Sequence, residues 1–143
     1  MTKKFSHDMT SDTANLKGLS EFVLSCLIPD ITDKSILDEI VISIDEVATN
    51  IILHAYEKRK DRPVHLDIEL SPEKVIFTFI HTGKVFDPVQ IDQPHLSKSI
   101  DEREINGMGL YIIQQFMSKV EYVFMDGTHK ENKIIMIKNL KKE

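Results

Sequence analysis

The sequence has 143 residues, of which 41% are hydrophobic and 29% charged, and this balance predicts a single folded domain spanning residues 1–143 rather than a disordered chain. Its formal net charge of −5 argues against nucleic acid as a main partner, and no apolar run is long enough to span a membrane. The single cysteine, Cys26, excludes an internal disulfide, and its apolar surroundings favour a buried thiol in a reducing, cytoplasmic compartment.

The N-terminal part of the chain predicts one strand followed by two helices. Residues 3–11, "KKFSHDMTS", fit an edge strand. Apolar residues at helical spacing predict a first helix from Asp12 to Pro29, with Ser11 or Asp12 as its N-cap. A second helix is predicted over residues 33–56, about 24 residues long, with a broad apolar stripe along one side.

The remainder of the chain predicts four strands, one helix and a long loop. Strands are expected at 64–70, 74–83, 121–125 and 132–140, a lid loop at 87–105, and a helix at 107–120. Strands joined by short turns pair antiparallel, so the sheet is expected to be mixed but mainly antiparallel. Because each helix has one apolar stripe, the helices should cover one face of the sheet. The predicted fold class is therefore an α+β two-layer sandwich.

Three polar residues of the second helix, Glu46, Asn50 and His54, recur every four positions. Successive residues turn about 100° around a helix, so these side chains share one face, and Glu39 and Ser43 are predicted on that polar side too. A solvated surface would explain such a face, but asparagine is unfavourable in mid-helix. A carboxylate and an amide one turn apart also suit a hard cation, and the carboxylate suits proton transfer from a hydroxyl.

Two glycine-containing segments flank the predicted lid. In "INGMGLYII", Gly107 and Gly109 open a helix directly after the loop, where backbone amides and the helix dipole favour a phosphate group. In "IHTGKVFDP", a strand runs out through Thr82 and Gly83 towards Asp87. Taken singly, the first segment also fits an ordinary loop–helix boundary and the second a plain strand-exit turn.

Taken together and in this order, the three segments resemble the GHKL ATPase superfamily, whose Bergerat-fold nucleotide site occurs in histidine kinases and gyrase-type ATPases. Within it, the chain is similar to the RsbW-like family of anti-sigma-factor serine kinases, from about Leu16 to Leu140. "DEVATNIILHAY" resembles their N-box, "HTGKVFDP" lies where they carry Asp-x-Gly-x-Gly-Phe-Asp-Pro, and "GMGLYII" resembles their Gly-x-Gly-Leu box. The resemblance implies the histidine-kinase-type ATPase fold.

The resemblance also implies roles for individual residues. It assigns nucleotide contacts to Asn50, His54, His81, Gly83, Arg103, Gly107, Met108, Gly109 and Thr128. Asn50 would also hold Mg²⁺ against the ATP phosphates, and Glu46 would be the catalytic base towards a serine or water. The glycines would offer backbone amides to phosphate, and Arg103 in the lid would meet the γ-phosphate, since phosphoryl transfer depends mainly on positioning and charge neutralisation.

The sequence departs from the family pattern in two of its boxes. His81 replaces the aspartate that receives the adenine amino group, and Val85 replaces the second glycine. A neutral imidazole can accept one hydrogen bond, but it lacks the charge of the aspartate. In the last box, Thr128 stands four residues before its expected place, which Asn132 occupies, so either residue could fill it.

The resemblance implies an ATP- and Mg²⁺-dependent serine/threonine-protein kinase that regulates transcription as an anti-sigma factor. It would phosphorylate an anti-anti-sigma protein of the STAS type, sequester a sigma factor and form a homodimer, with no role in binding nucleic acid or membranes. Two alternatives stay open. The chain could be a degenerate, non-catalytic regulator with weak or no ATP binding, because of His81 and Val85. It could also be a simple ATPase switch whose lid orders with ligand.

Overall fold

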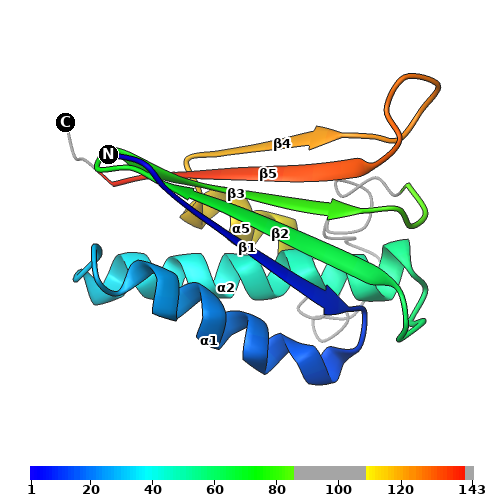
Figure 1. The fold of residues 1–143 in the computed structure, drawn as a ribbon, viewed down its shortest axis with the longest axis horizontal. Helices are drawn as coiled ribbons and strands as arrows, with labels where there is room; N and C mark the ends of the chain where they lie inside the picture. Colours follow the sequence, from blue (N-terminus) through cyan, green and yellow to red (C-terminus); the bar gives the residue numbers. More distant parts are fainter. Residues whose placement is uncertain (86–108, 141–143) are drawn as a thin grey trace, which may run out of the picture.

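The computed structural model of the protein describes residues 1–85 and 109–140, which form a sheet covered by helices on one side (Figure 1). The elements in chain order are β1 (Lys3–Thr10), the 3₁₀-helix η1 (Thr13–Asn15), α1 (Leu16–Leu27), α2 (Lys34–Asn50), the π-helix η2 (Ile51–Ala55), β2 (Pro63–Leu70), β3 (Lys74–His81), α5 (Gly109–Phe116), β4 (Lys119–Val123) and β5 (Asn132–Asn139). This order and the two-layer α+β class confirm the fold predicted from the sequence.

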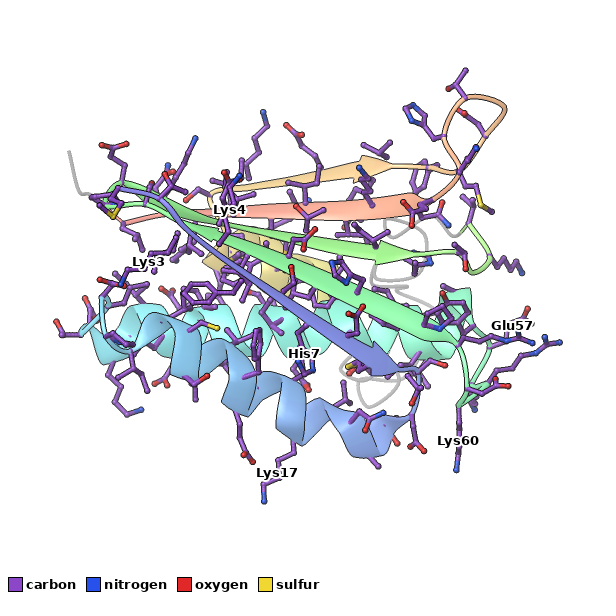
Figure 2. The ribbon with its side chains drawn as sticks, viewed as in Figure 1. Lys3, Lys4, His7, Lys17, Glu57 and Lys60 are labelled. Atoms are coloured by element: carbon purple, nitrogen blue, oxygen red, sulfur yellow. The ribbon has the colours of Figure 1, made fainter. Side chains whose placement is uncertain are left out.

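The five strands lie in the order β1-β2-β3-β5-β4, and all four neighbouring pairs are antiparallel. The predicted edge strand is confirmed, because β1 pairs only with β2 among the described strands. Side chains alternate between the two faces of each strand, so one face of the sheet is apolar and meets the helices. His7 of β1 points towards α1, where its ring stacks on Phe22 with the ring centroids 4.6 Å apart (Figure 2).

A single hydrophobic core lies between the sheet and the helices. It includes Phe77 and Phe79 of β3, both wholly buried, and the apolar stripe of α2. Cys26 is buried in the same core, as its apolar surroundings predicted, and burial raises the pKa of its thiol. The apolar faces of the strands and the apolar stripes of the helices therefore pack together in one core. The opposite face of α2 lies outside this core.

The first helix begins differently from its prediction. Asp12 caps η1 by accepting a hydrogen bond from the Ala14 amide at 2.9 Å, and α1 itself starts three residues later than η1. Ser11 is not a cap. Its hydroxyl is buried, donates to the Arg59 carbonyl oxygen and accepts from the Arg62 amide at 3.1 Å. This serine therefore ties the end of β1 to the segment that leads into β2.

The second helix reaches nearly to its predicted end, but its last turn is a π-helix. In η2 the Tyr56 amide donates to the Ile51 carbonyl oxygen at 3.0 Å, a bond spanning five residues. Glu57 and Lys58 then leave the helix with positive φ values of 51° and 70°. Figure 2 shows Glu57 and Lys60 at this end of the molecule. Because π-turns inside helices often mark functional sites, the end of this helix is a candidate location for the site.

Candidate functional site

The predicted polar face of α2 is present, although one predicted member does not belong to it. Glu46, Asn50 and His54 are all half-buried, rather than fully exposed as on a simple solvated face. Ser43 was predicted on this face and is instead wholly buried, because its hydroxyl is satisfied by donating to the Glu39 carbonyl oxygen at 2.9 Å. Glu39 forms an ion pair at 3.0 Å with Lys138 of β5, so its carboxylate serves to join the two layers.

The Glu46 carboxyl group has the chemistry of a proton acceptor. Burial raises its pKa above the ordinary glutamate value, and the neighbouring charge of Asp45 raises it further. A carboxylate whose pKa moves towards neutrality accepts a proton more readily from a hydroxyl group. Asn50 follows one turn later as the last residue of α2, and its amide oxygen is a suitable ligand for a hard cation.

His54 continues this face into the π-helix. Burial lowers the pKa of its imidazole below the ordinary histidine value, which favours the neutral ring at pH 7. A neutral imidazole can donate one hydrogen bond and accept another. The three predicted residues thus remain on one side of a continuous helical segment, α2 followed by η2, and offer a carboxylate, an amide and a neutral imidazole.

The exit of strand β3 lies against the end of η2. The Lys84 amide donates to the Ala55 carbonyl oxygen at 2.8 Å. A Cβ on Gly83 would stand 2.7 Å from that same oxygen and 2.8 Å from the Tyr56 ring. A residue other than glycine would therefore push the two segments apart. Gly83, to which the resemblance assigns a nucleotide contact, therefore also has a structural role, because it allows the exit of β3 to meet the end of η2.

Tyr56 fixes this junction from inside. Its hydroxyl donates to the Pro63 carbonyl oxygen at 2.6 Å and accepts from the Thr82 amide at 2.9 Å. One buried side chain thus joins the helix end, the start of β2 and the exit of β3. This role of Tyr56 is not predicted from the sequence, although the position of Tyr56 at the end of the apolar stripe was the available signal.

His81 is buried at the end of β3, on the core-facing side of the sheet, with only 3% of its surface exposed. Its Nδ1 accepts a hydrogen bond from the Gly83 amide at 3.2 Å, and its ring lies edge-on to the Tyr56 ring with centroids 5.8 Å apart. Burial lowers the pKa of the imidazole to about 4, so the ring is neutral at physiological pH.

Asn132 lies directly beside this cluster, whereas Thr128 does not. Asn132 is opposite His81 in the β3–β5 register and is buried. Its side-chain amide donates to the Gly83 carbonyl oxygen at 3.1 Å and its carbonyl oxygen accepts from the Met125 amide at 2.7 Å. Thr128 is exposed in a turn, where its amide and hydroxyl both donate to the Asp126 carboxylate. The geometry favours Asn132 for the last box, and a nucleotide contact from Thr128 stays a prediction.

The segment "INGMGLYII" is described only in part. Gly109 opens α5, which packs on α2. Arg103, Gly107, Met108 and the predicted lid at 87–105 lie outside the described residues, so their predicted roles stay predictions. The described part of the helix places Ile113 in the core, which sets α5 beside α2 in the helical layer.

The residues present fit a metal-bound phosphate better than they fit adenine. Glu46 and Asn50 supply the oxygen donors that Mg²⁺ prefers, and no group of three His, Cys, Asp or Glu side chains within the described residues offers a metal site of the protein alone. Beside His81 and Asn132, where the resemblance implies the adenine contact, the described residues leave a hollow of only ≈ 10 Å³. The residues that line this hollow include no carboxylate that could accept a hydrogen bond from an adenine amine.

Comparison with known proteins bears on the family and the fold of the chain. The family model for the histidine kinase-like ATPase domain matches residues 9–138. The crystal structure of the RsbU and RsbW domains of Rv1364c from Mycobacterium tuberculosis has the same fold, with a TM-score of 0.66 at 12% identity, covering 95% of this chain and 32% of that chain. No helix in residues 1–85 or 109–140 is both long and apolar enough to cross a membrane.

Curated relatives carry kinase and anti-sigma names. Serine/threonine-protein kinase BtrW of Bordetella bronchiseptica is 30% identical over 83 residues, which are 58% of either chain. The anti-sigma F factor of Clostridium beijerinckii is 28% identical over 85 residues, 59% of either chain. The anti-sigma F factor of Oceanobacillus iheyensis is 29% identical over 106 residues, 74% of this chain and 71% of the relative. The match thus spans less than two thirds of the first two relatives.

Proposed function

The chain belongs to the histidine kinase-like ATPase family, and from this premise we propose that it is a nucleotide- and Mg²⁺-dependent serine/threonine-protein kinase acting as an anti-sigma factor. ATP is the nucleotide that the family name implies. The single observation that carries the proposal is the pair Glu46 and Asn50, a half-buried carboxylate of raised pKa and an amide one turn apart on one helix face. A partner-binding module without chemistry would have no need of this pair.

In the proposed reaction, each described residue has a limited task. Bound Mg²⁺ and the nucleoside triphosphate would supply the phosphoryl group and neutralise its charge. Asn50 would hold the metal, and Glu46 would accept the proton that leaves a serine hydroxyl as its oxygen bonds to phosphorus. Gly83 and Tyr56 would keep the proposed nucleobase-binding end of the site in place, because they hold the exit of β3 against η2.

The names of the relatives support the choice of partners. One relative is called a serine/threonine-protein kinase and two are called anti-sigma F factors. We therefore propose an anti-anti-sigma protein of the STAS type as substrate, a sigma factor as the alternative partner, a homodimer as the working form and the cytoplasm as the compartment. Control of transcription would follow from the phosphorylation state of the substrate, which decides which partner the kinase holds.

The test is transfer of a labelled γ-phosphate to STAS-domain proteins encoded in the same genome. Wild-type protein should label a serine of one of them in the presence of Mg²⁺. Glu46→Gln should lose the transfer and still bind nucleotide, because only the proton acceptor is removed. Asp38→Asn, an exposed carboxylate of the same helix paired with Lys34, is the matched control and should keep activity. Full transfer by Glu46→Gln would remove Glu46 as the base.

A second function has a specific observation in its favour. The buried neutral His81 and the ≈ 10 Å³ hollow beside it are unlike a site prepared for adenine. These features favour a non-catalytic regulator that binds its partner without ATP. Calorimetric titration separates the two functions, since the regulator would bind no nucleotide even at millimolar concentration. A simple ATPase switch would instead release phosphate without any protein substrate.

A further inference from the structure

The turn that joins η2 to β2 gathers positive charge in a chain whose net charge is −5. Residues 57–62, together with Lys84 at the exit of β3, hold five of the chain's 18 lysines and arginines but only two of its 23 aspartates and glutamates. All of these residues are exposed. Figure 2 shows Glu57 and Lys60 at this end of the molecule, with Lys60 pointing outwards. The local excess of positive charge is therefore unlike the rest of the chain.

A hollow of ≈ 330 Å³ lies within this basic turn. The described residues that line it include the cationic Arg59, Arg62 and Lys84 and one acidic residue, Glu57. Positive charges gathered around a hollow reinforce one another and attract an anion. Within residues 1–85 and 109–140, neither Arg59 nor Lys84 forms an ion pair, and Arg62 pairs with Asp61 at 3.5 Å. The described part of the chain thus neutralises little of this charge.

Hydrogen bonds hold the backbone of the turn in place before any partner binds. The buried hydroxyl of Ser11 donates to the Arg59 carbonyl oxygen and accepts from the Arg62 amide at 3.1 Å. The third cationic residue is fixed as well, because the Lys84 amide donates to the Ala55 carbonyl oxygen at 2.8 Å. The three residues that carry the charge therefore start from fixed backbone positions, which lowers the entropic cost of binding a ligand.

The chemistry of the hollow selects a carboxylate. The guanidinium fork of an arginine matches a carboxylate with two parallel hydrogen bonds, and a lysine adds a compact positive charge. The volume of the hollow is close to the lower limit of about 300 Å³ for small-molecule sites, so a side chain fits it better than a whole cofactor. We propose that this hollow is a docking site for a carboxylate side chain in an acidic segment of a protein partner.

A protein segment matches this surface better than an extended polyanion. A nucleic acid or an anionic membrane laid across the molecule would meet mainly acidic residues beyond the turn, whereas a peptide segment needs only the hollow. Because Ala55 lines the hollow, a partner held there lies at the end of the helical segment that carries Glu46 and Asn50. The inference goes beyond the proposed function and does not depend on phosphoryl transfer, since a regulator without catalysis must hold its partner as well.

The first experiment tests whether the wild-type protein recognises carboxylates. Fluorescence anisotropy at low ionic strength, where exposed charges are least screened, would compare three labelled probes. They are a short peptide of alternating glutamate and serine, the same peptide with glutamine for glutamate, and a thymidine oligonucleotide of equal charge. The glutamate peptide should bind about tenfold more tightly than the glutamine peptide. Absent binding, equal binding of the two peptides, or tighter binding of the oligonucleotide would overturn the inference. The kinase proposal would stand, because it rests on Glu46 and Asn50.

The second experiment tests whether the peptide binds in the hollow. Arg59→Gln combined with Lys84→Gln should weaken binding of the glutamate peptide about fivefold or more. The matched control combines Lys17→Gln with Lys130→Gln, which removes the same charge from α1 and from the turn before β5 and should change the affinity little. Figure 2 shows Lys17 pointing away from the sheet. All four side chains are exposed, so both variants should fold, and their melting temperatures would check this. Equal losses in the two variants would assign the binding to overall charge and overturn the inference.

Discussion

The backbone of Gly83 lies against the carbonyl oxygen of Ala55, so closely that a Cβ added to Gly83 would stand 2.7 Å from that oxygen. This contact joins the exit of β3, in the segment "HTGKVFDP", to the end of the helix that carries Glu46 and Asn50. The same carbonyl oxygen accepts a hydrogen bond from the Lys84 amide at 2.8 Å. This bond, made by the residue after Gly83, holds Gly83 close to Ala55. The exit of β3 and the end of the helical segment that carries Glu46 and Asn50 are therefore in direct contact.

Gly83→Ala should destabilise the protein, because the new methyl group meets backbone that cannot yield easily. Overpacking of this kind costs about 1–3 kcal/mol in the free energy of unfolding, which urea titration would measure. The cause is space and not backbone conformation, since no described glycine has a positive φ. Gly127→Ala is the control, because a Cβ there would meet nothing within 4 Å. Equal stabilities of the two variants would contradict the close contact.

Tyr56→Phe should lower stability while leaving the ring packing intact. The change removes the donor to the Pro63 carbonyl oxygen and the acceptor for the Thr82 amide, and buried groups left without a partner cost on the order of 1–3 kcal/mol. Amide hydrogen exchange should locate the effect at Thr82, whose protection depends on the lost hydroxyl. Unchanged protection of that amide would show that Tyr56 does not hold the strand exit.

Much of the fold could be predicted from the sequence, because its signals are periodic. The alternation of apolar residues in β2 and β3 and the apolar stripe of α2 are sufficient to predict the two layers. The predictions that are wrong concern positions where a single hydrogen bond determines the environment of a side chain. A serine was expected on a polar face, but Ser43 is buried because its hydroxyl is satisfied by a carbonyl oxygen one turn back. The π-turn likewise does not disturb the helical spacing of apolar residues, so the sequence does not predict it.

The candidate site was predictable in its residue types and not in its hydrogen bonds. The spacing of Glu46, Asn50 and His54 indicated one face, and all three are half-buried there. By the family resemblance, His81 stands where an aspartate is expected. The sequence could not show that the Gly83 amide occupies Nδ1, because that depends on how the strand exit folds back on its own last residue. The hydrogen bonding of His81 therefore depends on the conformation of the turn at residues 81–83.

His65 should make stability depend on pH through the outer face of the sheet. Its Nδ1 lies 2.6 Å from Asp8 of β1 and its Nε2 lies 2.7 Å from Asp67, and the bond to Asp8, followed by that to Asp67, raises its pKa above the ordinary value. The protonated ring is thus favoured by folding. Its stabilisation should be complete below the ordinary histidine pKa of about 6.5 and should fade as pH rises through the raised value.

Urea unfolding at about pH 6 and about pH 8.5 would measure this effect of His65. The wild-type protein should lose more stability over the interval than His65→Gln, which cannot take a proton. Amides of β1 should lose protection first, because Asp8 is the partner contributed by the edge strand. Identical losses in both proteins would exclude His65 as the source.

His81 should act with the opposite sign and at lower pH. Burial lowers its pKa to about 4 in the folded state, so the unfolded chain takes up the proton first as pH falls below about 6.5. Stability should therefore decline between about pH 6.5 and about pH 4 by up to a few kcal/mol. His81→Asn should flatten this acid limb of the stability profile. A wild-type limb that persists in His81→Asn would assign the decline to other groups.

Asn50→Ala tests the metal role directly. Without the amide oxygen, Mg²⁺ loses a proposed protein ligand, so the affinity for a magnesium nucleotide should fall about tenfold or more, whereas the affinity for the metal-free nucleotide should change little. Calorimetric titration with and without Mg²⁺ measures both. Asn15→Ala is the control, since the side-chain amide of this asparagine donates to Thr10 and the residue belongs to η1, outside α2 and η2. If Asn50→Ala lost the same factor with and without Mg²⁺, Asn50 would serve the fold of the helix end and not the metal.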